Sequence, residues 1–345
     1  MPEDEAPMKL MLLSLSFAGA LICAAVMGFA IQRGATCAVA AVSEITSSRN
    51  CSRLLAMAEA SLYVCGGLLI AQRLHLLPIM PSGYPVDGLT VLGGALLGLG
   101  AFINGACVFG AVARLGSGQW AYAATPLGYY VGCVGLLALW PQAERPVLAT
   151  ASPVWSAAPL LTPLFLLFVG WRLLRLWQRA RRHGAPATLV QTWHARVGAR
   201  IWSPHHATTV VGLTFLLLLL LAGAWSYTEV LAELARGSAA MLPARALLSL
   251  GLLAGAILGG ISAGRREGPA TSSAQCLRCF TGGAIMGWGS MLIPGGNDGL
   301  LLVGMPLLWP YAWVAFGTMC VTIALAQWLR RRLGQAAATP GAPQS

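Results

Sequence analysis

Long apolar stretches, separated by short polar or glycine- and proline-rich stretches, dominate this chain of 345 residues. An apolar stretch of about 20 residues can cross the hydrocarbon core of a bilayer as a helix, and shorter ones are typical of re-entrant segments. The pattern therefore predicts an all-α integral membrane protein with about nine spanning or half-spanning helices. These lie near residues 10–31, 54–71, 88–113, 121–140, 157–171, 207–224, 246–263, 281–293 and 300–328.

A glycine-rich phrase occurs twice in the chain. Residues 93–110 read GGALLGLGAFINGACVFG, and residues 282–299 read GGAIMGWGSMLIPGGNDG, with six residues identical at matching positions and no gap. Repeats of this kind are typical of transporters whose halves close around one site, where helices are interrupted by glycine or proline. We therefore expect two pseudo-symmetric repeats with interrupted, Gly-rich helices. The halves are not equivalent, because Cys107 in the first copy corresponds to Gly296 in the second.

The same pattern divides the chain into four parts. We expect residues 1–171 to form the first membrane repeat and residues 207–330 the second. Between them, residues 172–206 are rich in Arg and His and are predicted to be a basic cytoplasmic connector. Residues 331–345 are expected to form a disordered C-terminal tail.

Composition and charge exclude a soluble protein and indicate an orientation. Hydrophobic residues make up 57% of the chain, charged residues only 10%, and the mean hydropathy is +0.70. With nine crossings and an acidic N-terminus outside, 17 of the 22 Lys and Arg residues fall on the inner side, as expected for cytoplasmic loops. The remaining five are Lys9, Arg73, Arg145, Arg236 and Arg245.

This charge distribution predicts a multi-pass protein of the inner (cytoplasmic) membrane, with the N-terminus periplasmic and the C-terminus cytoplasmic. The net charge of +11 is then explained by orientation and by attraction to the headgroups of the lipid bilayer. Nucleic acid is not an expected partner, because the basic residues flank membrane segments rather than a nucleic-acid-binding module.

The cysteines fall into groups according to their surroundings. Cys23, Cys65, Cys133 and Cys320 lie inside long apolar runs, where a thiol packs like a small hydrophobic group. Cys37 and Cys107 instead follow glycines that interrupt a run, in RGATC and NGACVFG. These two are the first candidates for chemistry.

Cys276 and Cys279 form a CxxC pair in a stretch that we expect to be a cytoplasmic loop, residues 265–280. One such pair cannot complete a structural zinc site, and a disulfide is disfavoured in a reducing cytosol. Two interpretations remain open: a chance pair, or a thiol pair that relays sulfur, with Arg278 between the cysteines favouring thiolate.

Other ionisable residues offer little evidence for a metal or cofactor. His205 and His206 adjoin the start of a predicted helix, and no histidine lies deep within one, which argues against a membrane haem. We therefore expect no metal and no cofactor. Glu59 lies inside a predicted helix near its cytoplasmic end, so both an ion path and contact with interfacial water remain open.

The cysteine and glycine motifs resemble those of the YeeE/YedE family of membrane proteins. The matching residues are Arg33–Cys37, then Gly105–Gly110 with Arg114 following, and Gly295–Gly299, in which Gly296 stands where the family has cysteine. The resemblance implies import of thiosulfate into bacterial cells along a pathway of cysteines, whose thiols hold the terminal sulfur by weak hydrogen bonds. It also implies a cytoplasmic sulfur-carrier protein as a partner.

The chemistry of an anion pathway agrees with these motifs. A doubly charged sulfur oxyanion in a low-dielectric pore needs donors, which the N-termini of interrupted helices supply, and glycine permits close approach. Neutral thiols add weak donors that release their ligand. We expect the pathway to include Cys37, Cys107, Gly105, Asn104, Gly295, Gly296 and Asn297. Asp298 is expected to be a turn residue in an outer loop, although it would repel an anion if it faced the pathway.

The sequence thus predicts a non-enzymatic inner-membrane permease for a small sulfur-containing anion, thiosulfate first. No ATP-binding motif is present, so a gradient or downstream consumption supplies the energy. The alternative from another class is a membrane thiol oxidoreductase or sulfur-transfer protein that uses Cys276 and Cys279. A third hypothesis is a non-transporting scaffold or sensor, which the loss of cysteine at Gly296 keeps open.

Overall fold

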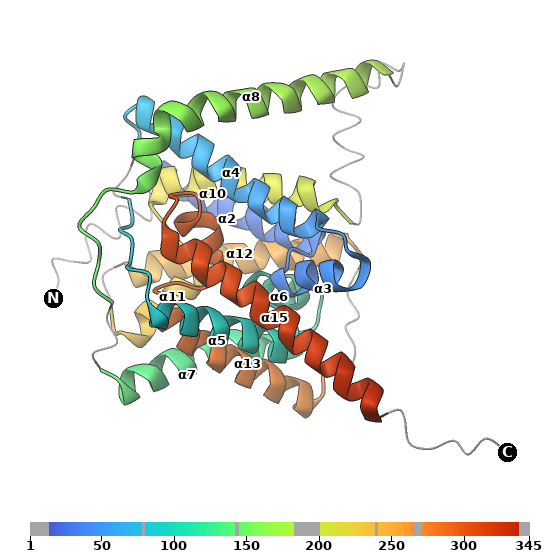
Figure 1. The fold of residues 1–345 in the computed structure, drawn as a ribbon. Coiled ribbons are helices and arrows are strands. Elements are labelled where there is room, and N and C mark those ends of the chain that lie inside the picture. Colours follow the sequence, from blue (N-terminus) through green and yellow to red (C-terminus); the bar gives the residue numbers. More distant parts are fainter. Residues whose placement is uncertain are drawn as a thin grey trace.

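The computed structural model describes residues 14–77, 80–141, 145–182, 201–238, 241–264 and 271–337, which form a bundle of helices with no β-strand in these ranges (Figure 1). Within them, eight helices are long and apolar enough to cross a membrane. The all-α integral membrane class predicted from the sequence is confirmed.

The described residues of the first half of the chain form six helices, one 3₁₀ turn and a long peripheral helix. They are α2 (Leu15–Gly34), α3 (Ala38–Ser48), α4 (Ser52–Arg73), α5 (Gly88–Asn104), α6 (Val108–Gly116), η1 (Trp120–Ala123), α7 (Ala124–Leu139) and α8 (Pro153–Arg182). The second half contains α10 (Pro204–Ala222), α11 (Tyr227–Ala235), α12 (Leu242–Ser262), α13 (Ser273–Leu292), α14 (Asn297–Gly299), η2 (Leu300–Gly304) and α15 (Pro310–Ala337).

Several predicted runs are divided differently in the structure. The run at 88–113 is two helices, because Gly105 closes α5 in the left-handed conformation with φ of +77°. The run at 300–328 is wrong as a single span, since residues 300–304 are a π-helical turn and α15 begins only at Pro310. The apolar pattern did not mark α3 or α11 as separate helices. Hydropathy continues across such breaks, whereas the helix does not.

Three expected boundaries also move. Cys276 and Cys279 lie on α13 and not in a loop, because Ser272 caps that helix by accepting a hydrogen bond from the Gln275 N–H at 3.2 Å. The helix α15 continues to Ala337, past the expected start of the tail at residue 331. The helices α8 and α10 leave only residues 183–203 of the expected connector between them, of which 183–200 lie outside the described residues.

The helices of the two halves pack against each other in reciprocal pairs. The helix α2 packs on α12, and α4 packs on α10. In the same way α5 packs on α15, and α13 packs on α7, while α5 and α13 contact each other. This pairing is the one that two repeats related by a two-fold axis would make. The pseudo-symmetric repeat itself stays a prediction.

Glycines bring the paired helices into backbone contact. A Cβ at Gly28 of α2 would lie 1.8 Å from the Leu252 carbonyl oxygen, and one at Gly255 of α12 would lie 1.7 Å from the Ala25 carbonyl oxygen. The repeated phrase makes the same kind of contact between α5 and α13, where a Cβ at Gly100 would lie 2.6 Å from the Gly282 carbonyl oxygen. Small residues at helix crossings are the usual basis of packing between membrane helices.

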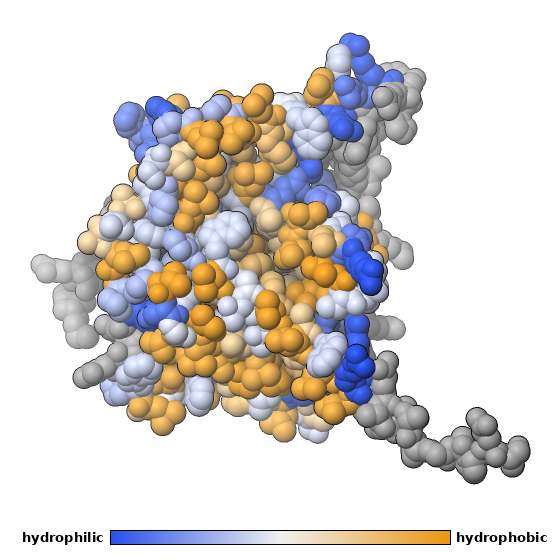
Figure 2. All heavy atoms as spheres, in the orientation of Figure 1, coloured by the Kyte–Doolittle hydropathy of each residue, from blue (hydrophilic) through white to orange (hydrophobic). Residues whose placement is uncertain are grey.

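The bundle has two ends and an apolar outer surface between them. We name the end where α5 begins, at the left of Figure 1, the Asp87 face, and the opposite end, where α4 begins, the Arg53 face. Between these ends, exposed leucine, valine and tryptophan side chains cover the outside, and apolar residues dominate the view in Figure 2. The helix α8 stands apart at the top of Figure 1 and packs mainly on α4. Such a surface fits lipid.

The α2–α12 contact yields a stability prediction. Replacing Gly255 by valine places a branched side chain against the Ala25 carbonyl and forces the two helices apart. Overpacking of this kind destabilises a protein by about 1–3 kcal/mol or more. We expect Gly255→Val to lower the thermal unfolding midpoint in detergent. Gly317→Ala is the control, because a Cβ there has no neighbour within 4 Å. Equal midpoints for the two variants would contradict the close helix contact.

Candidate functional site

Cys37 and Cys107 face each other at the starts of two short helices. Cys37 precedes α3 and Cys107 precedes α6, each as the N-cap residue. The Ala38 N–H donates to the Cys107 Sγ at 3.2 Å, and the Cys107 N–H donates to the Cys37 Sγ at 3.5 Å. Both side chains are buried, Cys107 completely. The sequence predicted these cysteines separately, and the structure joins them.

A second pair of helix starts comes from the other half of the chain. Ser226 caps α11 by accepting the Glu229 N–H at 3.3 Å, and Gly296 precedes α14. The two starts are joined by Asp298, whose carboxylate accepts the Thr228 hydroxyl at 2.5 Å and the Thr228 N–H at 3.4 Å. This pair therefore uses a hydroxyl and a carboxylate where the first pair uses thiols.

Asn297 connects the two pairs of helix starts. Its Oδ1 accepts the Val108 N–H at 3.3 Å, and the Tyr227 hydroxyl donates to the Val108 carbonyl oxygen at 3.0 Å. Asn297 is completely buried, yet its Nδ2 has no hydrogen-bond partner. A buried amide donor without an acceptor is costly, so its position marks a place where an acceptor is expected to bind.

Asn104 and Gly105 shape the turn before Cys107. The Asn104 Nδ2 donates to the Ala106 carbonyl oxygen at 2.7 Å, and its Oδ1 accepts the Thr125 hydroxyl at 2.9 Å. With both ends of its amide occupied, Asn104 holds the turn in place rather than offering a free donor. Gly105 takes the left-handed conformation that glycine tolerates best.

The second interrupted helix leaves no room for a side chain at its start. A Cβ at Gly296 would lie 2.5 Å from the Thr228 Oγ1 and 2.7 Å from the Asp298 Oδ1, so cysteine at 296 fits only if these groups move. Gly295 has φ of +140°, which favours glycine. Asp298 is only 3% exposed, so the expectation that it is an outer-loop turn residue was wrong. Its hydrogen bonds to Thr228 draw it into the protein.

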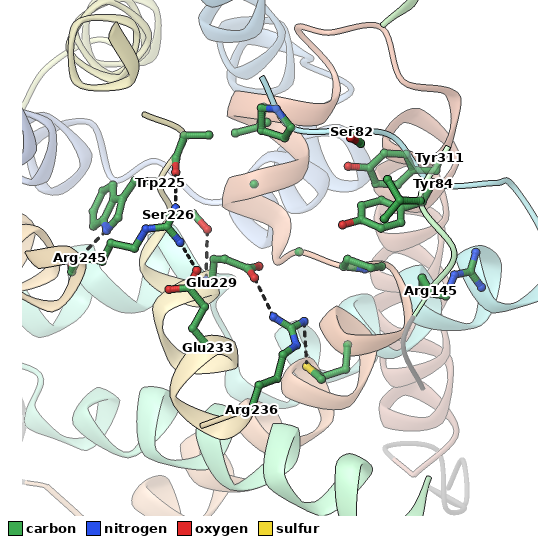
Figure 3. A pocket seen from close by; sticks show the side chains of 18 of the residues that line it. Ser82, Tyr84, Arg145, Trp225, Ser226, Glu229, Glu233, Arg236, Arg245 and Tyr311 are labelled. Atoms are coloured by element: carbon green, nitrogen blue, oxygen red, sulfur yellow. Dashed lines mark hydrogen bonds and ion pairs between the residues drawn. The ribbon is translucent and has the colours of Figure 1, made fainter. Parts of the chain in front are cut away.

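A cavity of about 440 Å³ borders the second pair of helix starts on the side of the Asp87 face, and Figure 3 shows side chains that line it. We call it the vestibule. Its floor includes Ser226, Gly295 and Gly299. Three arginines line its walls, each near a carboxylate: Arg236 pairs with Glu229 at 2.9 Å, Arg145 pairs with Asp87 at 2.9 Å, and Arg245 pairs with Glu233.

The Asp87–Arg145 pair stays charged at neutral pH. Partial burial would raise the pKa of the Asp87 carboxyl, but hydrogen bonds from Arg145 and Thr90 outweigh it and lower that pKa below its usual value. In the sequence, Arg145, Arg236 and Arg245 stood out only as exceptions to the predicted inner excess of Lys and Arg. That exception was the available signal for a site at these residues.

The route toward the Arg53 face is much narrower. A pocket of about 10 Å³ lies beside Cys37 and is lined by Thr36, Arg53, Met57 and Thr208. Such a volume holds no more than about one water. The vestibule therefore ends beside the second pair of helix starts, and of the two cysteines only Cys37 borders one of these two pockets, the narrow one.

The CxxC pair lies apart from the thiol pair. Cys279 is completely buried on α13, while Cys276 is half-buried. Between them, Arg278 donates from Nε to the Ile103 carbonyl oxygen at 3.3 Å. This bond ties the start of α13 to the end of α5, next to the turn at Asn104. The described residues contain no cluster of His, Cys, Asp or Glu suited to a metal ion.

Glu59 has partners on two other helices. Its carboxylate contacts Arg172 of α8 at 2.7 Å and His205 of α10 at 2.7 Å. This arrangement ties α4 to α8 and α10 outside the thiol site.

Long apolar helices, interrupted helices that meet at a buried site, and a vestibule with arginines define a multi-pass membrane transport protein. The chain belongs to the sulphur-transport family, whose profile matches residues 33–325. Its relatives include the thiosulfate transporter TsuA of Escherichia coli (strain K12), which is 24% identical over 338 residues, covering 90% of this chain and 93% of that protein. The resemblance to the YeeE/YedE family is confirmed, and with it transport of sulfur compounds.

Thiol accessibility tests the geometry of the site. Cys51 is exposed, whereas Cys37 and Cys107 are buried. We expect a bulky maleimide to label Cys51 rapidly in folded protein and to label Cys37 and Cys107 only after unfolding, as measured by mass spectrometry of the peptides. Cys51→Ser serves as the control and removes the rapid labelling. Fast labelling of Cys107 in the folded protein would contradict the closed site.

Proposed function

We propose that this protein imports a small sulfur oxyanion, most directly thiosulfate, through the site where the four helix starts meet. The observation that carries the proposal is the unpartnered, buried Nδ2 of Asn297 beside the thiol pair of Cys37 and Cys107. Helix N-termini offer N–H groups and positive potential to an anion. The similarity to the thiosulfate transporter supports this substrate class.

The charges in the protein suit passage rather than capture. The vestibule lining holds three arginines and only two carboxylates, those of Glu229 and Glu233, so it favours entry of an anion without binding it at an unpaired cation. Deeper in, the groups named around Cys107 are thiols, amides and backbone N–H groups. Neutral donors hold an anion less tightly than a charge-assisted pair does, which allows release.

The route follows from the order of these groups. An anion enters the vestibule, reaches Ser226 and Gly295 at its floor, and exchanges its water for the Asn297 amide and the Cys107 thiol. It then passes to Cys37, which borders the narrow pocket near Arg53. The thiols act as hydrogen-bond donors throughout, and no covalent bond forms or breaks. Opening of the narrow pocket completes the passage.

We assign the Asp87 face to the periplasm of a bacterial cell and the Arg53 face to the cytoplasm, in keeping with the excess of Lys and Arg on that side. Moving a dianion into a negatively charged interior costs about 4.6 kcal/mol at 100 mV, since each charge costs about 2.3 kcal/mol. A coupled ion or cytoplasmic consumption of the anion must supply this energy. A sulfur-carrier protein at the Arg53 face would provide such consumption.

The competing hypothesis is sulfur or electron transfer at Cys276 and Cys279. Complete burial of Cys279 makes that thiol a poor partner for an external protein. The geometry therefore favours a permease.

If the Cys107 thiol contacts the anion, removing it should slow uptake strongly. Cys107→Ala removes a hydrogen bond to a charged ligand, worth about 1.5–3 kcal/mol, so uptake of radiolabelled thiosulfate into proteoliposomes should fall by about 10- to 100-fold. Cys320→Ala on α15 is the matched control, because that half-buried thiol lies in a different helix from those that build the site. Full uptake by the Cys107→Ala protein would contradict a pathway in which the Cys107 thiol binds the anion.

The vestibule predicts a change in apparent affinity. Arg236→Gln leaves Glu229 without its cation, so the vestibule repels an anion that it now attracts. We expect KM for thiosulfate uptake to rise by about tenfold, equivalent to about 1.4 kcal/mol, with a smaller effect at high ionic strength. Arg73→Gln is the control, since Arg73 is exposed and does not line the vestibule. An unchanged KM for Arg236→Gln would show that anions enter elsewhere.

A further inference from the structure

Asp298 is a buried carboxylate without a cationic partner among the described residues. Its hydrogen-bond donors in the structure are uncharged groups, namely the hydroxyl and the N–H of Thr228. The vestibule carboxylates and Glu59 are paired with arginine, which makes Asp298 different in kind. An unpaired buried charge is expensive, so such a carboxyl readily binds a proton.

Asp298 also lies on the proposed route. It follows Asn297, whose Nδ2 is unpartnered, and its Oδ1 fills the space that a side chain at Gly296 would occupy. Gly295 and Gly299, on either side of it in sequence, line the vestibule floor. An anion moving from the vestibule to Cys107 therefore passes this carboxyl.

The two protonation states of Asp298 have opposite effects on an anion. As a carboxylate it repels a dianion strongly, because the surroundings are buried and weakly screened. As a neutral acid it carries no charge and can itself donate a hydrogen bond. Passage is then favoured only when a proton is present.

We propose that Asp298 is a proton-binding site that couples entry of the anion to entry of a proton, an inference that rests on the proposed permease function. The proton binds an Asp298 carboxylate oxygen from the vestibule, is passed to an oxygen of the dianion as the anion moves toward Cys107, and is released from the anion on the Arg53 face. One proton and one dianion then cross together with a net charge of −1, and Asp298 is left as a carboxylate for the next cycle. No electron is transferred, and no S–S or S–O bond of the anion changes.

The other ionisable groups near Asp298 do not replace it in this role. Tyr129 of α7 and Tyr227 of α11 face it, and Cys107 lies at the start of α6 nearby. These groups are neutral near pH 7 in their ordinary range, whereas a carboxyl changes charge at lower pH. The Tyr227 hydroxyl is already engaged as a donor to the Val108 carbonyl.

The experiment compares net uptake with exchange. Proteoliposomes are given an inward proton gradient, and radiolabelled thiosulfate uptake is measured together with internal pH by a trapped dye. For the native protein we expect the gradient to accelerate uptake several-fold and the interior to acidify as thiosulfate enters. For Asp298→Asn we expect neither effect, while exchange of external for internal thiosulfate continues. Glu59→Gln changes a carboxylate that is paired with Arg172 and His205 outside the thiol site, and it should behave like the native protein.

Two results would overturn the inference while leaving the permease intact: native uptake that ignores the gradient, or Asp298→Asn protein that still responds to it, in either case with exchange present. Absence of thiosulfate exchange in the native protein would overturn the proposed function itself. A further variant, Thr228→Val, removes a donor to the carboxylate form. The pH of half-maximal uptake should then move upward, and an unmoved pH profile would contradict the role of Asp298.

Discussion

The first N–H groups of a helix have no acceptor within that helix, and the hydrocarbon core of a bilayer supplies none. Helices that start inside this bundle must therefore find acceptors on one another. Ala38 and Cys107 donate to thiol sulfurs across the α3–α6 contact, and Val108 donates to Asn297. These acceptors are weak or uncharged, so an anion can take their place. The unpaired N–H groups at these helix starts thus force the helices to contact one another and also provide donors for an anion.

The two halves meet this requirement with different chemistry. The first half uses the sulfur of Cys37 and Cys107, and the second uses Thr228 and Asp298 around Gly296. A cysteine side chain at position 296 would meet Thr228 and Asp298, which already occupy that space. Sulfur contacts are loose and polarizable, whereas the hydroxyl–carboxyl contact depends on protonation. The pathway therefore has one site of weak contacts, at the thiols of Cys37 and Cys107, and a second site, at Asp298, whose charge depends on protonation.

Much of the architecture followed from pattern alone, and the remainder depended on distant contacts. Apolar length was enough for the membrane class, and Gly105 marked a real helix break. Pattern did not show that Cys37 and Cys107 touch, because they are far apart in sequence. It placed Asp298 in a loop, because an N-D-G tripeptide usually forms a turn, whereas hydrogen bonds from Thr228 bury it. The sequence also did not show that the three vestibule arginines, which come from different parts of the chain, line one cavity.

The most direct test of the account is to locate the bound anion. A crystal structure with thiosulfate, using the anomalous signal of its sulfur atoms, shows where the ligand lies in the folded protein. We predict the anion between the Asn297 amide and the Cys107 thiol, within hydrogen-bonding distance of both. Thiosulfate bound instead at Cys276 and Cys279, with the space beside Asn297 empty, would contradict the central claim.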